Sequence, residues 1–174
     1  MPIDRPTRRS RRLSGFDYRS AASYFITICT HNRSSLFGRV TDQVFVPSAE
    51  GMVADEEWRH TCQLREILVP DVHCVMPNHV HLLFSINWSD DVVFDASDIG
   101  QLRLLADSVS AIVGGYKAAV TRRIRRDLNR PDLEVWQERF HDHVVKTPQS
   151  FDQIAEYIVN NPLVWEQDRY NADL

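Results

Sequence analysis

The stretch that decides the fold spans residues 72–84 and reads VHCVMPNHVHLLF. Successive side chains of a β-strand point to opposite faces, so His79 and His81 would share one face while Val80 points into the core. Two neutral imidazoles on a rigid strand form half of a metal site. A polar pair in so apolar a run indicates a function, because buried polar groups are costly unless they are satisfied.

The sequence on either side of this stretch alternates between strand and helix patterns. Strands are predicted at residues 24–30, 40–46, 67–76, 79–86 and 136–145. Helices are predicted at residues 48–59, 109–128 and 147–161. We expect a turn at Pro77-Asn78 between the two central strands and an acidic loop at residues 88–100. The order predicts an α+β fold, a ferredoxin-like split βαβ plait whose antiparallel sheet carries helices on one face.

The length and composition predict one globular domain. With 174 residues, 43% of them hydrophobic, the chain can bury a core of its own. We expect residues 1–20 to form a basic flexible arm and residues 21–174 to form a single domain. No run approaches the roughly 18 apolar residues of a membrane span, and no apolar signal core follows the basic N-terminus. The three cysteines show no close pairing, so we expect reduced thiols in a cytoplasmic protein.

The basic residues are clustered although the net charge is −4. All but two of the 20 basic residues are arginine, whose guanidinium suits bidentate phosphate contacts. The candidate DNA-binding residues lie in the arm and on the predicted 109–128 helix: Arg8, Arg9, Arg11, Arg12, Lys117, Arg122, Arg123 and Arg126. Local patches can attract a polyanion even when the total charge is negative. A flexible arm and a solvated helix face explain the charge alone equally well.

The predicted C-terminal helix contains a second group of candidate site residues. Its apolar stripe consists of Phe151, Ile154, Ala155 and Ile158. At about 100° per residue, Tyr157 and Asn161 fall together on one flank, beside the buried face but outside it. Position alone favours an ordinary boundary aromatic for Tyr157. For Asn161 it is compatible with the N-cap of a segment that starts at Pro162.

Four segments together resemble the REP-associated tyrosine transposases, which are single-strand transposases with a His-hydrophobe-His motif. The segments are YFITICTHNR at residues 24–33, VMPNHVH at 75–81, WQERF at 136–140 and YIVNNP at 157–162. The resemblance spans about residues 11–170, which is nearly the whole chain. A lone His-Val-His triplet is a weak signal. The same triplet preceded by Pro-Asn and followed about 80 residues later by Tyr-x-x-x-Asn-Pro is a specific one.

The resemblance implies a plait fold with the activity of a tyrosine transposase. That activity is cleavage and rejoining of single-stranded DNA with Mg²⁺ or Mn²⁺, through a covalent 5′-phosphotyrosine. By motif, Tyr157 is implied as the nucleophile and His79 and His81 as metal ligands. Asn161 is implied as the third ligand, where related single-strand transposases carry glutamine and thus also an amide oxygen. The implied partners are single-stranded DNA hairpins of REP-like repeats, bound at the nucleoid by a monomer or a homodimer.

Two other functions are compatible with these residues. A metallohydrolase would use the His-x-His pair with water as its nucleophile. A catalytically silent or domesticated protein of the same fold would only bind DNA hairpins, although the full set of histidines, tyrosine and asparagine argues against it. His143 belongs to a second His-x-His pattern, and a structural hydrogen bond at a strand end is its favoured interpretation.

Overall fold

The computed structural model describes residues 22–87 and 108–171. Within them a four-stranded sheet has the order β4-β5-β1-β6, and every neighbouring pair is antiparallel. The strands are β1 (Ala22–Cys29), β4 (Leu68–Met76), β5 (His79–Ile86) and β6 (His141–Val145). The predicted arm and acidic loop, residues 1–20 and 88–100, lie outside the described residues.

Three helices flank the sheet: α1 (Ala49–Gln63), α3 (Val109–Asp127) and α4 (Pro148–Asn160). Each begins where the sequence offers a hydroxyl cap. The side-chain oxygens of Ser48, Ser108 and Thr147 each accept a hydrogen bond from the backbone N–H three residues further on. No helix of the described residues is long and apolar enough to cross a bilayer.

The main core lies between the sheet and the helices α1 and α3. Strand alternation sends one set of side chains from β1 and β5 into it, all fully buried: Tyr24, Ile26, Ile28, Val80, Leu82, Phe84 and Ile86. Trp58 of α1 fills the space between the layers. α3 contributes a stripe of buried residues: Val109, Ile112, Val113, Tyr116, Val120 and Ile124. Since Val80 belongs to this core, His79 and His81 lie on the opposite face.

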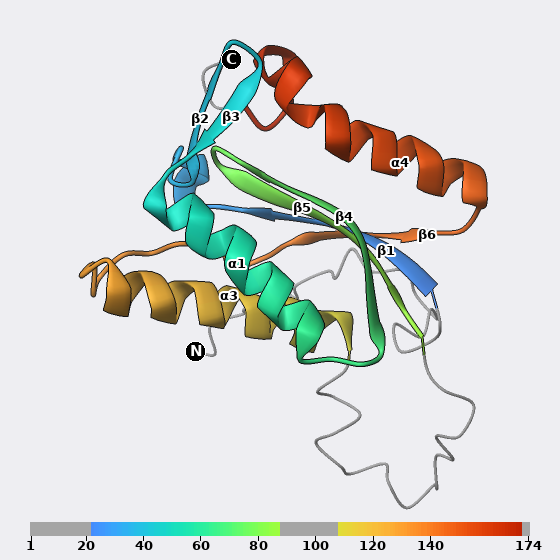
Figure 1. Ribbon diagram of the computed structural model, residues 1–174, viewed down its shortest axis with the longest axis horizontal. Coiled ribbons are helices and arrows are strands. Elements are labelled where there is room, and N and C mark those ends of the chain that lie inside the picture. Colours follow the sequence, from blue (N-terminus) through green and yellow to red (C-terminus); the bar gives the residue numbers. More distant parts are fainter. Residues whose placement is uncertain (1–21, 88–107, 172–174) are drawn as a thin grey trace, which may run out of the picture.

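The predicted plait is confirmed, but its helices do not all lie on one face. Figure 1 shows α1 and α3 on one side of the sheet and α4 on the other. Ile158 of α4 is fully buried in a second, smaller core with Leu83 and Val145, on the histidine face. The prediction that all helices lie on one face is therefore wrong for α4. The apolar stripe of α4 covers a second apolar patch, which lies on the histidine face of the sheet.

The central hairpin has the bounds that the sequence predicts. β4 and β5 meet at Pro77-Asn78, and β5 begins at His79 and ends at Ile86. On its other side, β5 pairs with β1. The histidine motif therefore lies at the start of a central strand, close to a tight turn and supported by a strand on both sides.

The segment at residues 40–46 forms a hairpin where one short strand was predicted. Asp42 and Gln43 adopt positive φ angles of 52° and 63°, and these reverse the chain. The result is a separate two-stranded sheet of β2 (Gly38–Thr41) and β3 (Val44–Pro47).

The strand predicted over residues 136–145 is also shorter than expected, since only β6 belongs to the sheet. Trp136 forms an isolated bridge with Thr30, and its ring packs against Phe37 and Tyr116. At the start of this segment, Trp136 packs its ring on the core, and the segment pairs with the sheet only from His141 onwards. An apolar and β-branched sequence therefore does not separate these two roles.

Candidate metal and tyrosine site

His79 and His81 lie side by side at the start of β5. Both are fully buried, and their Nε2 atoms are 3.0 Å apart. Desolvation by burial lowers the pKa of both imidazoles, so both are neutral near pH 7. The alternation inferred from the sequence thus brings two metal-ligating nitrogens to one point.

A chain of hydrogen bonds determines the tautomer of His79. The amide nitrogen of Asn78 donates to the carbonyl oxygens of Tyr170 at 2.6 Å and Arg33 at 3.3 Å. The amide oxygen of Asn78 therefore faces Nδ1 of His79, at 2.9 Å, and accepts a hydrogen bond from it. Because a neutral imidazole carries one proton, Nε2 of His79 presents a lone pair.

His81 is held in the same way from β1. Its Nδ1 lies 2.9 Å from Oγ1 of Thr27, its partner in the strand register. The Thr27 hydroxyl can accept from this nitrogen or donate to it. When it accepts, both rings carry the proton on Nδ1, and their two Nε2 lone pairs face each other and repel unless a cation or a proton lies between them. Two ligands about 2.1 Å from an octahedral ion, on adjacent vertices, are about 3.0 Å apart. The observed separation of 3.0 Å therefore fits a divalent ion of this kind.

Tyr157 approaches the histidines from α4. Its hydroxyl oxygen is 3.3 Å from Nε2 of His81, and its ring stands edge-on to Phe25 with centroids 6.2 Å apart. Burial, with the nearby carboxylate of Asp168, raises the pKa of the phenol to about 12, and the charge of Arg169 opposes this shift. The flank position expected for Tyr157 thus brings its hydroxyl to the imidazoles.

Asn161 lies one turn beyond Tyr157 and is fully buried. Its amide nitrogen donates to Oδ2 of Asp168 at 2.7 Å, whereas its amide oxygen has no hydrogen-bond partner within the described residues. The side chain interacts with both His79 and Tyr157, since it raises the pKa of the first and lowers that of the second. Buried polar atoms are normally paired, so an unpaired amide oxygen beside two imidazoles fits a metal ligand.

The interpretation of Asn161 as the N-cap of a segment that starts at Pro162 is wrong, although Asn161 is the C-cap residue of α4. The chain continues from α4 directly into a 3₁₀ helix, η3 (Asn161–Gln167), whose N-cap is Asn160. No side-chain hydrogen bond caps η3. The buried amide of Asn161 is directed into the site and makes its bond to Asp168.

Asp168 completes the cluster, and sequence reasoning missed it. It is buried after the end of η3, and its Oδ1 accepts a hydrogen bond from the backbone N–H of Tyr170 at 2.7 Å. One ligand atom each from His79, His81 and Asp168 lie within 4.8 Å of one another, and these residues could hold a metal ion. The segment after Asn161 has no apolar period. The one available signal was an acidic residue shortly beyond the Tyr-x-x-x-Asn motif.

The basic residues predicted on α3 lie on the other side of the sheet from the histidines. Three of them are bound to neighbours: Lys117 to the carbonyl oxygens of Gln137 and Glu138, Arg123 to Glu56 and Glu57, and Arg126 to Asp127. Arg122 is exposed and lines an open groove of about 1080 Å³ between α3 and residues 131–138. The structure does not bring these four residues to Tyr157. Arg8, Arg9, Arg11 and Arg12 lie outside the described residues.

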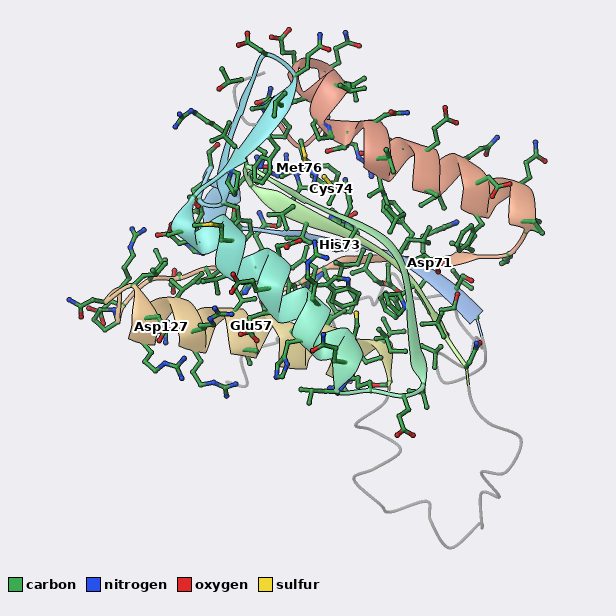
Figure 2. All side chains as sticks on the ribbon, viewed as in Figure 1. Glu57, Asp71, His73, Cys74, Met76 and Asp127 are labelled. Carbon is green, nitrogen blue, oxygen red and sulfur yellow. The ribbon has the colours of Figure 1, made fainter. Side chains whose placement is uncertain are left out.

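The other histidines are separate from the pair. His73 of β4 faces α1, where its Nε2 is 2.7 Å from Oδ1 of Asp55, while its neighbour Cys74 packs toward α4 (Figure 2). His143 of β6 pairs in register with Phe25, so it shares the histidine face, and it is exposed. Within residues 22–87 and 108–171 the imidazole of His143 forms no hydrogen bond, so its predicted structural bond is not present there.

No protein-family model matches the chain. An uncharacterized protein of Haemophilus influenzae is 34% identical over 173 residues, which cover 95% of this chain and 94% of that protein. The chain belongs to the same family as this protein. The match extends over almost the full length of both chains, so the family shares the whole fold and not one motif.

Among solved structures, a REP-associated tyrosine transposase bound to a REP hairpin has the same fold. The TM-score is 0.55 with 15% sequence identity, and the match covers 91% of this chain and 77% of that chain. At this identity the similarity shows the fold, and it confirms the predicted α+β plait. The chain thus has the fold of a solved protein from the group that its sequence motifs resemble.

Proposed function

We propose that this protein cleaves and rejoins single-stranded DNA through a covalent 5′-phosphotyrosine at Tyr157. The observation that carries the proposal is the approach of the phenol oxygen to Nε2 of His81, at 3.3 Å. The hydroxyl meets the imidazole nitrogen that remains available to a metal ion, because Nδ1 of His81 is already bonded to Thr27. A half-buried phenol needs a partner in any fold, but a nucleophile must in addition lie beside the metal site, as this one does.

His79, His81 and the amide oxygen of Asn161 are the metal ligands in this proposal. The amide oxygen suits Mg²⁺ or Mn²⁺, whereas imidazole donors favour transition-metal ions, so Mn²⁺ fits the mixed set better than Mg²⁺. A bound ion would offset negative charge on the phosphate. Asp168 supports the amide, since it accepts the N–H of Asn161 and leaves the amide oxygen beside His79. Outer partners of this kind orient the ligands of metal sites.

The cleavage step joins the Tyr157 oxygen to phosphorus and breaks the bond from phosphorus to the 3′-oxygen of the DNA. The phenol needs a proton acceptor, because a pKa of about 12 leaves little phenolate near pH 7. Oδ2 of Asp168 lies 3.5 Å from the hydroxyl and takes this proton, which returns through solvent to the departing 3′-oxygen. A 3′-hydroxyl can later attack the phosphotyrosine, expel the phenol and reseal the strand without ATP.

Hairpins of REP-like repeats are the proposed DNA. The solved transposase of the same fold is bound to a REP hairpin, which supports this class of partner for the present chain. Arg122 is the member of the α3 group without a hydrogen bond or ion pair among the described residues. With Arg8, Arg9, Arg11 and Arg12 it would hold phosphates of the stem. Residues 21–174 then form one catalytic domain with a basic arm, acting at the nucleoid in the cytoplasm.

A denaturing gel tests the proposal. The protein is incubated with end-labelled hairpin DNA and Mn²⁺, and we expect a protein–DNA adduct that EDTA and Tyr157→Phe each abolish. Tyr116→Phe is the matched control, because it makes the same change in the main core and should retain the adduct. Cleavage that survives Tyr157→Phe would indicate a metallohydrolase that uses water. Hairpin binding without cleavage by the wild-type protein would indicate a silent DNA-binding protein.

A further inference from the structure

Two arginines from opposite ends of the chain meet at one aromatic ring beside the histidines. The guanidinium carbon of Arg169 lies 4.8 Å from the ring centroid of Tyr170, and that of Arg33 lies 5.7 Å from it. Nη2 of Arg169 also donates to the Tyr170 hydroxyl at 3.0 Å. The Tyr170 ring is buried, with its centroid 4.8 Å from that of His79. Both positive charges therefore lie at the Tyr170 ring, which packs against His79 of the candidate metal site.

The backbone holds Arg33 in a conformation that few residues adopt. Arg33 and the preceding Asn32 both have positive φ angles, 53° and 52°, in the left-handed region. The carbonyl oxygen of Arg33 accepts a hydrogen bond from Asn78, the residue that also orients His79. A rare conformation tied to the metal-site residues indicates that the position of Arg33 matters to the site.

Both arginines lack a carboxylate partner among the described residues. Arg59, Arg123 and Arg130 each pair with a carboxylate, whereas Arg33 and Arg169 form no ion pair within residues 22–87 and 108–171. Both are exposed. Unpaired guanidiniums beside a site of this kind are suited to an anion, and the planar guanidinium matches a phosphate well.

Arg169 also lies on the path to the nucleophile. Tyr157, Asp168 and Arg169 line one cavity of about 520 Å³, together with Val164 and Gln167. A DNA strand that brings a phosphate to the Tyr157 hydroxyl must enter this cavity. The neighbouring phosphate of the strand then lies within reach of a charge fixed at the cavity wall.

We propose that Arg33 and Arg169, supported by Tyr170, form a binding site for the backbone phosphates next to the scissile phosphate of single-stranded DNA. Both are positioning residues, because they hold the strand and leave the bond changes to Tyr157. The proposal rests on the proposed function, since it assumes a DNA strand in the cavity. It adds a site that recognises the sugar-phosphate backbone and not the bases.

Salt dependence of DNA binding tests the site directly. Binding of fluorescent oligo(dT) of 20 nucleotides is measured by anisotropy across a salt series, with all variants in a Tyr157→Phe background that cannot form an adduct. For single strands, the slope of log affinity against log salt decreases by about 0.7 for each phosphate that the protein no longer neutralises. We expect that decrease for Arg33→Gln and for Arg169→Gln, and about twice that for the double variant. Thermal unfolding of each variant confirms that it is folded.

The matched controls separate a phosphate contact from a general change in charge. Arg59→Gln removes the same charge from α1, on the other side of the sheet, and should leave the slope unchanged. Arg169→Lys keeps the charge and should retain the slope. The proposal would be overturned if the folded double variant had the same salt slope as the Tyr157→Phe protein. It would also be overturned if Arg59→Gln decreased the slope as much as the Arg33 and Arg169 variants do.

A second measurement distinguishes this inference from the proposed function. Once wild-type cleavage of a hairpin has been mapped, single phosphates beside the cut are replaced with uncharged methylphosphonates. We expect one or two replacements to weaken binding to the protein with both arginines and to have no effect on the double variant. An adduct with wild-type protein but no such coupling would reject the arginine site alone. If no adduct forms at all, the proposed function is rejected. The salt slopes for oligo(dT) still test whether Arg33 and Arg169 bind backbone phosphates.

Discussion

Replacing Asn161 with aspartate should make the fold depend on a bound cation. The replaced amide nitrogen lies 2.7 Å from Oδ2 of Asp168, and both residues are buried. Two like charges about 4 Å apart repel by about 4 kcal/mol at an effective dielectric constant near 20. Protonating one carboxyl at pH 7, from an ordinary pKa of about 4, also costs about 4 kcal/mol. Either route lowers the free energy of unfolding of the metal-free protein by about 4 kcal/mol.

Urea unfolding in EDTA and in Mn²⁺ measures this effect. Asn160→Asp is the matched control, because it makes the same change one residue away, where the side chain forms no cap. Binding to the folded state stabilises it by about 2.7 kcal/mol at a ligand concentration 100 times Kd, so Mn²⁺ should return most of the loss. An unchanged stability of Asn161→Asp in EDTA would refute the close contact with Asp168. A loss that Mn²⁺ does not relieve would refute the assignment of Asn161 as a ligand.

Three further predictions concern the histidines and the core. The pKa values of His79 and His81 are lowered by burial, so the unfolded state binds more protons below its ordinary pKa of about 6.5. In EDTA, the free energy of unfolding should therefore fall as pH drops below about 6.5, by up to about 2.7 kcal/mol per pH unit for the two histidines together. His81→Gln removes one of them and should halve this slope, which urea titrations at several pH values measure. Asn78→Ala removes the amide oxygen that accepts the hydrogen bond from Nδ1 of His79. Calorimetry should then show roughly 10- to 100-fold weaker binding of Mn²⁺ to the protein. An unchanged Mn²⁺ affinity would contradict the assigned tautomer of His79. Tyr116→Phe removes the hydroxyl that donates to the carbonyl oxygen of Ala54, which keeps its bond within α1, so the free energy of unfolding should fall by about 0.5–1.5 kcal/mol without affecting the adduct.

The regular elements of this protein could be predicted because their signals are local. Ser48 and Thr147 start helices as capping residues, and the period-two pattern gives β5 its observed bounds. The helical period also places Tyr157 beside the buried stripe of α4, where the structure has it half-buried. Asn161 was expected on the same flank outside the buried face, but it begins η3 and is fully buried. These features need only a few neighbouring residues, so the sequence contains them in full.

The remaining features depend on contacts between distant segments. Asp168, Arg169 and Tyr170 reach the histidines through η3 and the turn after it, which carry no periodic pattern. Arg33 lies at the Tyr170 ring because residues 32 and 33 adopt left-handed backbone angles, which a residue with a side chain like that of arginine rarely adopts. The face on which α4 packs was likewise missed, because an apolar stripe does not state which of two apolar surfaces it will cover.

Peptide mass spectrometry after reaction with hairpin DNA tests the central claim most directly. Trypsin should release residues 147–169, in which Tyr157 is the single tyrosine. After nuclease digestion, we predict that this peptide carries a nucleotide phosphate on Tyr157, in samples with Mn²⁺ and not in samples with EDTA. Hairpin DNA that is cut while this peptide stays unmodified, or a nucleotide attached to another residue, would contradict the meeting of phenol and paired imidazoles around one ion.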